Sequence, residues 1–163
     1  MPLAQSRPDV TRPTGDPAAF ARYRSKTLAT WIALIGGCLG AHRFYLHGKG
    51  DVWAWLHPVP TLLGLAGVLR MRALGQDDHV AWLLIPLLGL MLSIAMLAAI
   101  VMGLTADEKW AERFNPGQAV QASGWAAVIG VILALMIGGA ALIGSIAFGG
   151  QKFFEYRAEQ GAG

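Results

Sequence analysis

The chain has 163 residues, of which 55% are hydrophobic and 14% are charged, and its formal net charge at pH 7 is +3. Ordinary globular domains carry about 25% charged residues, so this composition argues against a water-soluble enzyme or a soluble binding module. The small net charge gives no support to nucleic-acid binding. A single cysteine, Cys38, excludes an internal disulfide.

The first 26 residues are polar and basic, and the first apolar run comes after them. Residues 1–16 contain three prolines and few large apolar side chains, so we expect a disordered tail. Residues 17–26 alternate two aromatic rings with basic side chains, which is typical of a juxtamembrane segment on an anionic lipid surface. The order of these features does not match a cleavable signal peptide.

A first membrane span is predicted over residues 27–41, which are apolar and rich in glycine. The polar and aromatic residues after it can be tolerated at the far interface, where the rings form an aromatic belt. These residues are His42, Arg43, Phe44 and Tyr45. The turn at residues 47–51 then reverses the chain, with two glycines for positive φ and Asp51 as the N-cap of the next helix.

A second span is predicted over residues 52–69, and it contains an interruption with two prolines. The residues of this helix break are His57, Pro58 and Pro60. Proline has no amide hydrogen and clashes with the carbonyl four residues back, so we expect a kink and unpaired carbonyls at Ala54 and Leu56. Broken helices often line transport sites. The alternative is a structural kink capped by neighbouring helices and by Thr61.

Two further spans are predicted over residues 80–104 and 125–149, because neither contains a charged residue. A helix needs about 20 apolar residues to cross a hydrocarbon core of about 30 Å, and a soluble helix of this length would need a polar face. Between them, residues 106–114 predict a short interfacial helix that begins with a capping box formed by Thr105 and Glu108.

The predicted fold is therefore an all-α integral membrane protein with four transmembrane helices, the second of them kinked by two prolines. Residues 27–72 form one two-helix hairpin, residues 80–157 form a second two-helix unit, and residues 158–163 form a flexible tail.

The distribution of Lys and Arg predicts the orientation of these four spans. Nine lie in the N-terminal tail, the 70–79 connection and the C-terminal tail, against four in the other two connections. Because cytoplasmic loops are richer in Lys and Arg, both termini are predicted to be cytoplasmic.

The segments Ser25–Ala29 and Gly36–Leu46 resemble the two-transmembrane ("TM-two") domain family, whose bacterial members are called NINE proteins. The shared pattern is a basic S-K-x-x-A start, a glycine-rich first helix and a G-x-H-R-F-Y-L hinge. The resemblance covers residues 25–72 and implies a two-helix hairpin in a bacterial inner membrane. It implies no specific biochemical activity.

The hinge, residues 40–51, is the first candidate interaction surface. Arg43 offers a planar fork of donors that can bind a lipid phosphate or an acidic group of a partner. The alternative is that Arg43 extends to the headgroups and only anchors the turn. His42, His47, Asp51 and His57 are compatible in type with a divalent metal, but their spacing matches no metal motif, so no metal site is predicted.

Small residues recur every four positions on the first, third and fourth predicted spans. Such stripes let helix backbones approach closely in lipid, within one chain or between two copies. The packing candidates are Ala33, Gly37, Ala99, Gly103, Gly130 and Ala134.

The sequence contains no catalytic Cys–His or Ser–His arrangement, phosphate-binding loop or zinc-binding helix motif. We therefore expect no enzyme, no catalytic residue and no cofactor. The predicted function is a non-enzymatic multi-pass membrane protein that contacts the lipid bilayer, itself or another membrane protein, and no nucleic acid. The alternative is a transporter of a small solute or ion that uses the broken second helix. The lack of an acid or base inside the third and fourth spans disfavours transport.

Overall fold

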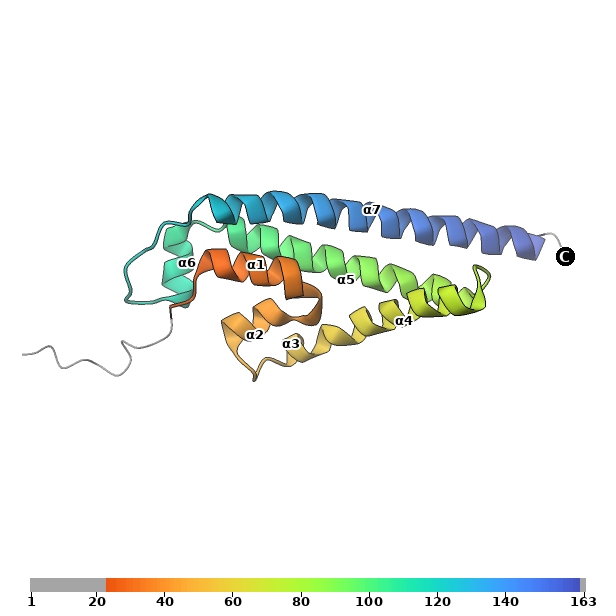
Figure 1. The fold of residues 1–163 in the computed structure, drawn as a ribbon, viewed down its shortest axis with the longest axis horizontal. Coiled ribbons are helices and arrows are strands. Elements are labelled where there is room, and N and C mark those ends of the chain that lie inside the picture. Colours follow the sequence, from red (N-terminus) through yellow and green to blue (C-terminus); the bar gives the residue numbers. More distant parts are fainter. Residues whose placement is uncertain (1–22, 162–163) are drawn as a thin grey trace, which may run out of the picture.

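The structure is a computed structural model that describes residues 23–161, and within this range every regular element is helical (Figure 1). The elements are α1 (Lys26–Gly36), the 3₁₀ helix η2 (Gly37–Leu39), α2 (Ala41–His47), α3 (Val52–Leu56), α4 (Pro58–Leu74), α5 (His79–Leu104), α6 (Asp107–Phe114) and α7 (Trp125–Gly161). The predictions for residues 1–16, and for most of the 17–26 segment, lie outside the described residues.

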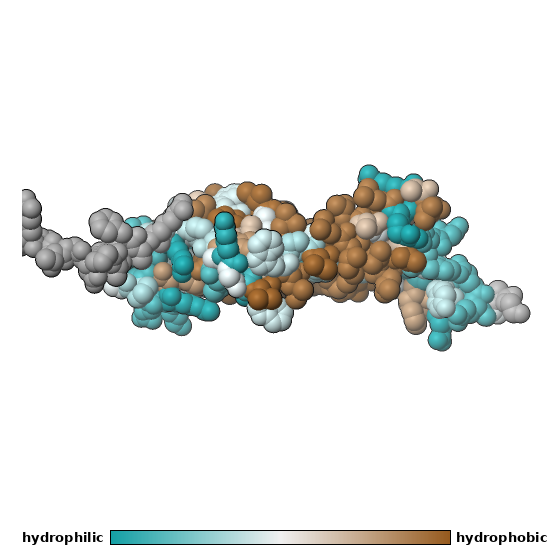
Figure 2. All heavy atoms as spheres, turned by 90° about the horizontal axis from the view of Figure 1, so that it is seen from below, coloured by the Kyte–Doolittle hydropathy of each residue, from teal (hydrophilic) through white to brown (hydrophobic). Residues whose placement is uncertain are grey.

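Among the described residues, three helical segments are long and apolar enough to cross a membrane: α3 with α4, α5 and α7. They run alternately in opposite directions, and both α4 and α7 pack along α5, which lies between them (Figure 1). At 1.5 Å per residue, the 26 residues of α5 extend about 39 Å. Figure 2 shows hydrophobic side chains along the middle of the molecule and hydrophilic ones at both ends, as in a multi-pass helical membrane protein.

The first predicted span differs from the structure, which has three long apolar helices where four were predicted. Helix α1 ends at Gly36, the 3₁₀ helix η2 follows, and α2 returns toward the end of the molecule where α1 began (Figure 1). The reversal uses Gly40, whose φ of 75° lies in the left-handed region. The glycines thus end the first helix early and turn it back, and α1, η2 and α2 form a short hairpin beside α5.

This hairpin changes the end at which the N-terminal segment lies. Lys26 contacts Asp107, so the start of α1 lies beside the connection between α5 and α7. The four-span prediction had put these two segments on opposite sides and both termini on one side. Figure 1 shows the described chain beginning at one end of the bundle and ending at the other. As predicted, one end of the helix bundle contains both the 47–51 turn and the 105–124 connection, where the rings of His47 and Phe114 are in contact.

The helix break is confined to one residue in the structure. His57 separates α3 from α4 and keeps helical angles, with φ −59° and ψ −41°, so the backbone does not unwind there. The Thr61 hydroxyl donates to the carbonyls of His57 (3.1 Å) and Cys38 (2.7 Å), which ties α4 to the tip of the hairpin. The prolines therefore form a packed joint between helices.

The predicted small residues lie between helices of the same chain. Ala33, Ala99 and Ala134 are fully buried. A Cβ on Gly37 would lie 2.7 Å from the Cβ of Ala95, and one on Gly130 would lie 3.0 Å from Thr30. Gly103 likewise faces Val131 of α7. The stripes therefore bring α1, α5 and α7 together within one protomer.

Two local predictions fail at helix ends. Helix α7 continues to Gly161, so residues 158–161 of the expected flexible tail are helical. Helix α6 forms as predicted, but Ala106 occupies its N-cap position and no side chain caps it. The Thr105 hydroxyl instead donates to the carbonyl of Val101, one turn back at the end of α5, which also accepts from the backbone nitrogen of Thr105.

Candidate functional site

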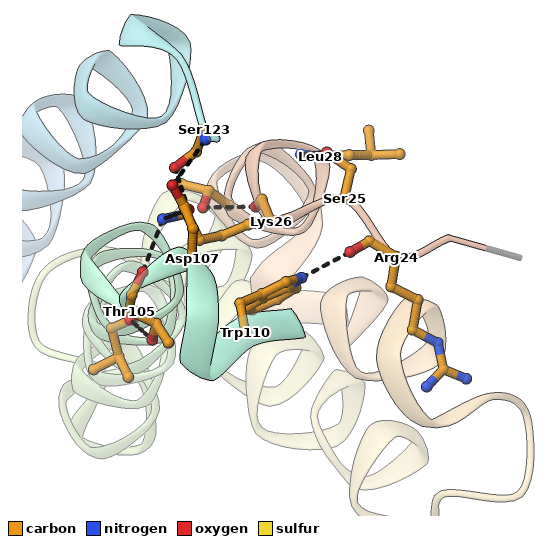
Figure 3. A network of polar contacts seen from close by, with 10 residues as sticks. Arg24, Ser25, Lys26, Leu28, Thr105, Asp107, Trp110 and Ser123 are labelled. Carbon is orange, nitrogen blue, oxygen red and sulfur yellow. Dashed lines mark hydrogen bonds and ion pairs between the residues drawn. The ribbon is translucent and has the colours of Figure 1, made fainter. Parts of the chain in front are cut away.

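An ion pair connects the N-terminal hairpin to the connection before α7 (Figure 3). The Nζ of Lys26 lies 2.5 Å from the Oδ1 of Asp107 and donates to the carbonyl of Thr105 at 2.8 Å. Asp107 also accepts hydrogen bonds from the backbone nitrogen and the hydroxyl of Ser123, at 3.0 and 2.6 Å. The Lys26 and Ser123 bonds lower the pKa of Asp107 to about 2. We call Lys26, Thr105, Asp107 and Ser123 the N-terminal clamp.

Hydrogen bonds to the backbone of Arg24 extend the contact between the same segments (Figure 3). The indole nitrogen of Trp110, a side chain only 3% exposed, donates to the Arg24 carbonyl at 2.7 Å. The side chain of Asn115 bonds both the nitrogen and the carbonyl of Arg24. Trp110 is therefore buried under the N-terminal segment, and α6 crosses the end of the bundle as a structural support.

The hinge residues mainly brace one another. The Nε of Arg43 donates to the Oδ2 of Asp51 at 2.8 Å, and the His47 Nδ1 lies 3.7 Å from the same oxygen. Asp51 caps α3 by accepting from the backbone nitrogen of Trp53 at 3.0 Å. The bond from Arg43 holds the pKa of Asp51 below its usual range. Arg43 therefore stabilises the turn, and only part of its donor capacity is used there.

The other hinge aromatics pack within the molecule. The ring of Phe44 contacts the ring of Trp55 edge-on, with centroids 5.1 Å apart. The Tyr45 hydroxyl accepts a hydrogen bond from the backbone nitrogen of Ser25 at 2.9 Å, which holds α2 against the N-terminal segment. Tyr45 is therefore not part of an aromatic belt at the far interface, as the four-span prediction required.

His42 and His57 meet at the joint, with ring centroids 5.8 Å apart. The Nδ1 of His57 lies 2.7 Å from the carbonyl of Trp53. His42 is 6% exposed, and its Nδ1 has no hydrogen-bond partner in the part of the chain that the structure describes. Within residues 23–161, no group of three or more metal-binding side chains is gathered.

A groove of about 430 Å³ lies between α2, α5 and α6. Its apolar walls are formed by Leu46, Ile94, Leu97, Ala98, Val101, Met102, Trp110 and Phe114. Four basic side chains with exposed or half-buried ends complete it: Arg43, His47, Lys109 and Arg113. Among the described residues, His42 and Thr105 also line it, and no Asp or Glu does. We call this cavity the basic groove.

Helix α6 separates its charges by face. Lys109 and Arg113 are one turn apart and line the basic groove, whereas Glu108 and Glu112 line a different hollow together with Asn115. The Arg113 guanidinium lies over the Phe114 ring, 5.3 Å from its centroid. Lys109 and Arg113 were not among the site residues predicted from the sequence, although their i, i+4 spacing indicates a shared helix face.

Comparisons with known protein families, curated proteins and solved structures found no match for this chain. The resemblance of residues 25–72 to the TM-two family therefore stays a prediction. The proposed function rests on the geometry of the basic groove.

Proposed function

We propose that this chain is a non-enzymatic multi-pass membrane protein that binds anionic phospholipid headgroups in the basic groove. The observation that carries the proposal is the combination of apolar walls and four basic side chains without an acidic one among the described lining residues. A phospholipid at a membrane interface presents the matching pair, an anionic headgroup joined to an apolar chain. A Lys or Arg near an anionic surface contributes about 1 kcal/mol to such binding.

The charge distribution supports an orientation with the basic groove on the cytoplasmic side. Six Lys and Arg of the described residues lie at the groove end of the bundle: Arg24, Lys26, Arg43, Lys49, Lys109 and Arg113. Four lie at the other end: Arg70, Arg72, Lys152 and Arg157. The richer end is cytoplasmic by the positive-inside rule, and anionic lipids are concentrated in that leaflet. In this proposal the C-terminus is on the opposite side, and the TM-two resemblance supports a bacterial inner membrane.

A lipid-binding measurement tests the proposal. The purified chain in mild detergent is titrated with phosphatidylglycerol and with phosphatidylcholine of the same acyl chains, and bound lipid is counted by native mass spectrometry. We expect tighter binding of phosphatidylglycerol. Replacing both Lys109→Gln and Arg113→Gln should weaken that binding about 10- to 30-fold, because two charges near the headgroup are lost.

The matched control is Arg72→Gln with Arg157→Gln, which removes the same charge from exposed positions at the other end. It should leave the preference for phosphatidylglycerol unchanged. Equal binding of the two lipids by the unmodified chain, or equal losses in the two double variants, would contradict the proposal.

The structure gives the transporter alternative no comparable support. The proline joint keeps a helical backbone, and Thr61 bonds the carbonyls of His57 and Cys38. The carbonyl of Ala54, freed by Pro58, lies against Gly40. Groups that a broken helix would offer to a solute thus have protein neighbours.

A further inference from the structure

A second groove, of about 330 Å³, lies between α5 and α7. Its walls are apolar apart from Ser93, whose hydroxyl donates to the carbonyl of Gly89 at 2.8 Å and contacts that of Gly138 at 3.3 Å. The hydroxyl is therefore already bonded within the protein. We call this cavity the acyl groove, and Leu90, Ile94, Leu97, Leu135, Gly139 and Leu142 are its principal lining residues.

Two adjacent glycines shape the acyl groove in different ways. A Cβ on Gly138 would lie 2.6 Å from the Cβ of Met96, so glycine at this position lets α7 approach α5 closely. A Cβ on Gly139 would meet nothing within 4 Å among the described residues, and this glycine lines the cavity. The first glycine brings the helices together, and the second leaves the space beside their contact open.

The acyl groove and the basic groove are neighbours on the surface of α5. Ile94 and Leu97, which are 50% and 59% exposed, line both of them. From Val101 in the basic groove to Leu90 in the acyl groove, α5 rises about 16 Å. This distance is close to half of a hydrocarbon core of about 30 Å, which is the depth of one leaflet.

We propose that the acyl groove holds an acyl chain of the anionic phospholipid whose headgroup lies in the basic groove. The inference rests on the proposed function and deepens it, because it makes the ligand a whole lipid of one leaflet. The walls of the acyl groove accept any acyl chain and do not select a lipid. The neighbouring basic groove selects an anionic headgroup, so the acyl chain beside it belongs to an anionic lipid. Van der Waals contact of the acyl chain with the groove walls then adds to the binding of the headgroup.

A photoreactive lipid tests this placement. Phosphatidylglycerol with a diazirine near the end of one acyl chain is incorporated with the full chain into nanodiscs of phosphatidylcholine and irradiated, and the labelled peptides are mapped by mass spectrometry. We expect labelling of residues around Leu90 on α5 and around Leu142 on α7, which lie at the end of the acyl groove farther from the basic groove. The same diazirine chain on phosphatidylcholine should label these residues at least fivefold less.

A groove-filling variant provides the second arm. Gly139→Trp should fill the acyl groove and reduce labelling of these residues at least fivefold. The matched control is Gly144→Trp on the same helix, where a Cβ also meets nothing within 4 Å among the described residues but faces a different hollow lined by Ile85 and Phe148. The control should label like the unmodified chain.

The outcomes separate the two proposals. If phosphatidylglycerol is preferred in the native mass measurement but its chain labels residues outside the acyl groove, the headgroup proposal stands and the acyl placement is wrong. Equal loss of labelling in Gly139→Trp and Gly144→Trp also overturns the placement. If both diazirine lipids label equally and phosphatidylglycerol is not preferred, both proposals are wrong.

Discussion

The substitution Gly40→Ala is expected to destabilise the fold by about 3 kcal/mol. A left-handed backbone with φ of 75° costs a residue with a Cβ about 1–2 kcal/mol. The new Cβ would also lie 2.5 Å from the carbonyl oxygen of Ala54, and such overpacking costs about 1–3 kcal/mol. The midpoint of thermal unfolding in mild detergent, followed by far-ultraviolet circular dichroism, measures the effect.

Gly117→Ala is the matched control for this prediction. Gly117 has nearly the same φ, 77°, in the turn closed by the hydrogen bond from Gln118 to Asn115, but a Cβ there would meet nothing within 4 Å in the described part of the chain. It should show only the backbone cost, about 1–2 kcal/mol. Equal losses at the two positions would contradict the close approach of Gly40 to the proline joint.

The second large effect is expected at the N-terminal clamp, where Asp107→Asn should cost about 2–3 kcal/mol. The Lys26 side chain is only 9% exposed, and the substitution leaves its ammonium group without a charged partner. The cost lies below that of a fully buried pair because Asp107 is 23% exposed. The same thermal measurement at pH 7 checks it. Glu159→Gln, which removes the partner of His79 where both side chains are 55% exposed, should change the midpoint little.

The clamp also predicts the direction of a pH dependence. The pKa of Asp107 is about 2 in the folded chain, below the value of about 3.9 for a free aspartate. The stabilisation by this carboxylate is therefore present above pH 4 and is lost as the pH falls from about 4 to about 2. Asp107→Asn should remove that part of the acid dependence. An unchanged acid profile in this variant would show that Asp107 does not contribute to it.

The long helices could be predicted from the sequence because their cause is local. In lipid, a run of 25 uncharged residues such as 80–104 can form all its backbone hydrogen bonds only as a helix, whichever other helices pack against it. The C-terminal end of α6 also followed from the sequence, since Asn115 and Pro116 end the helix.

The N-terminal hairpin could not be predicted in the same way. The apolar composition of residues 27–46 fits one crossing helix or two short antiparallel ones. The choice depends on tertiary contacts: Lys26 is held by Asp107, 81 positions away, and Gly40 packs on a carbonyl that Pro58 has freed. None of these pairings leaves a local sequence signal.

The candidate site was predicted in part. The hinge does contribute Arg43 and His47 to the basic groove, but the Nε donor of Arg43 is used by Asp51. The remaining charges come from Lys109 and Arg113, which lie more than 60 residues later in the chain. The sequence predicts that Lys109 and Arg113 share one helix face. It does not predict that this face lies opposite α2, because that position depends on the fold of the N-terminal hairpin.

Cysteine accessibility tests most directly the central claim, that the N-terminal helices form a hairpin on the groove side and three helices span the membrane. Single cysteines are introduced in a Cys38→Ala background as Arg24→Cys, Lys49→Cys, Ala119→Cys, Gln76→Cys and Gln160→Cys. Arg24 is suitable because its contacts with Trp110 and Asn115 use its backbone. A membrane-impermeant maleimide is applied to intact cells and to inverted vesicles.

The three-span structure predicts that cysteines at positions 24, 49 and 119 react together in inverted vesicles, and that those at 76 and 160 react together in intact cells. If the cysteine at position 24 instead reacts from the same side as those at 76 and 160, α1 crosses the membrane and the account is wrong.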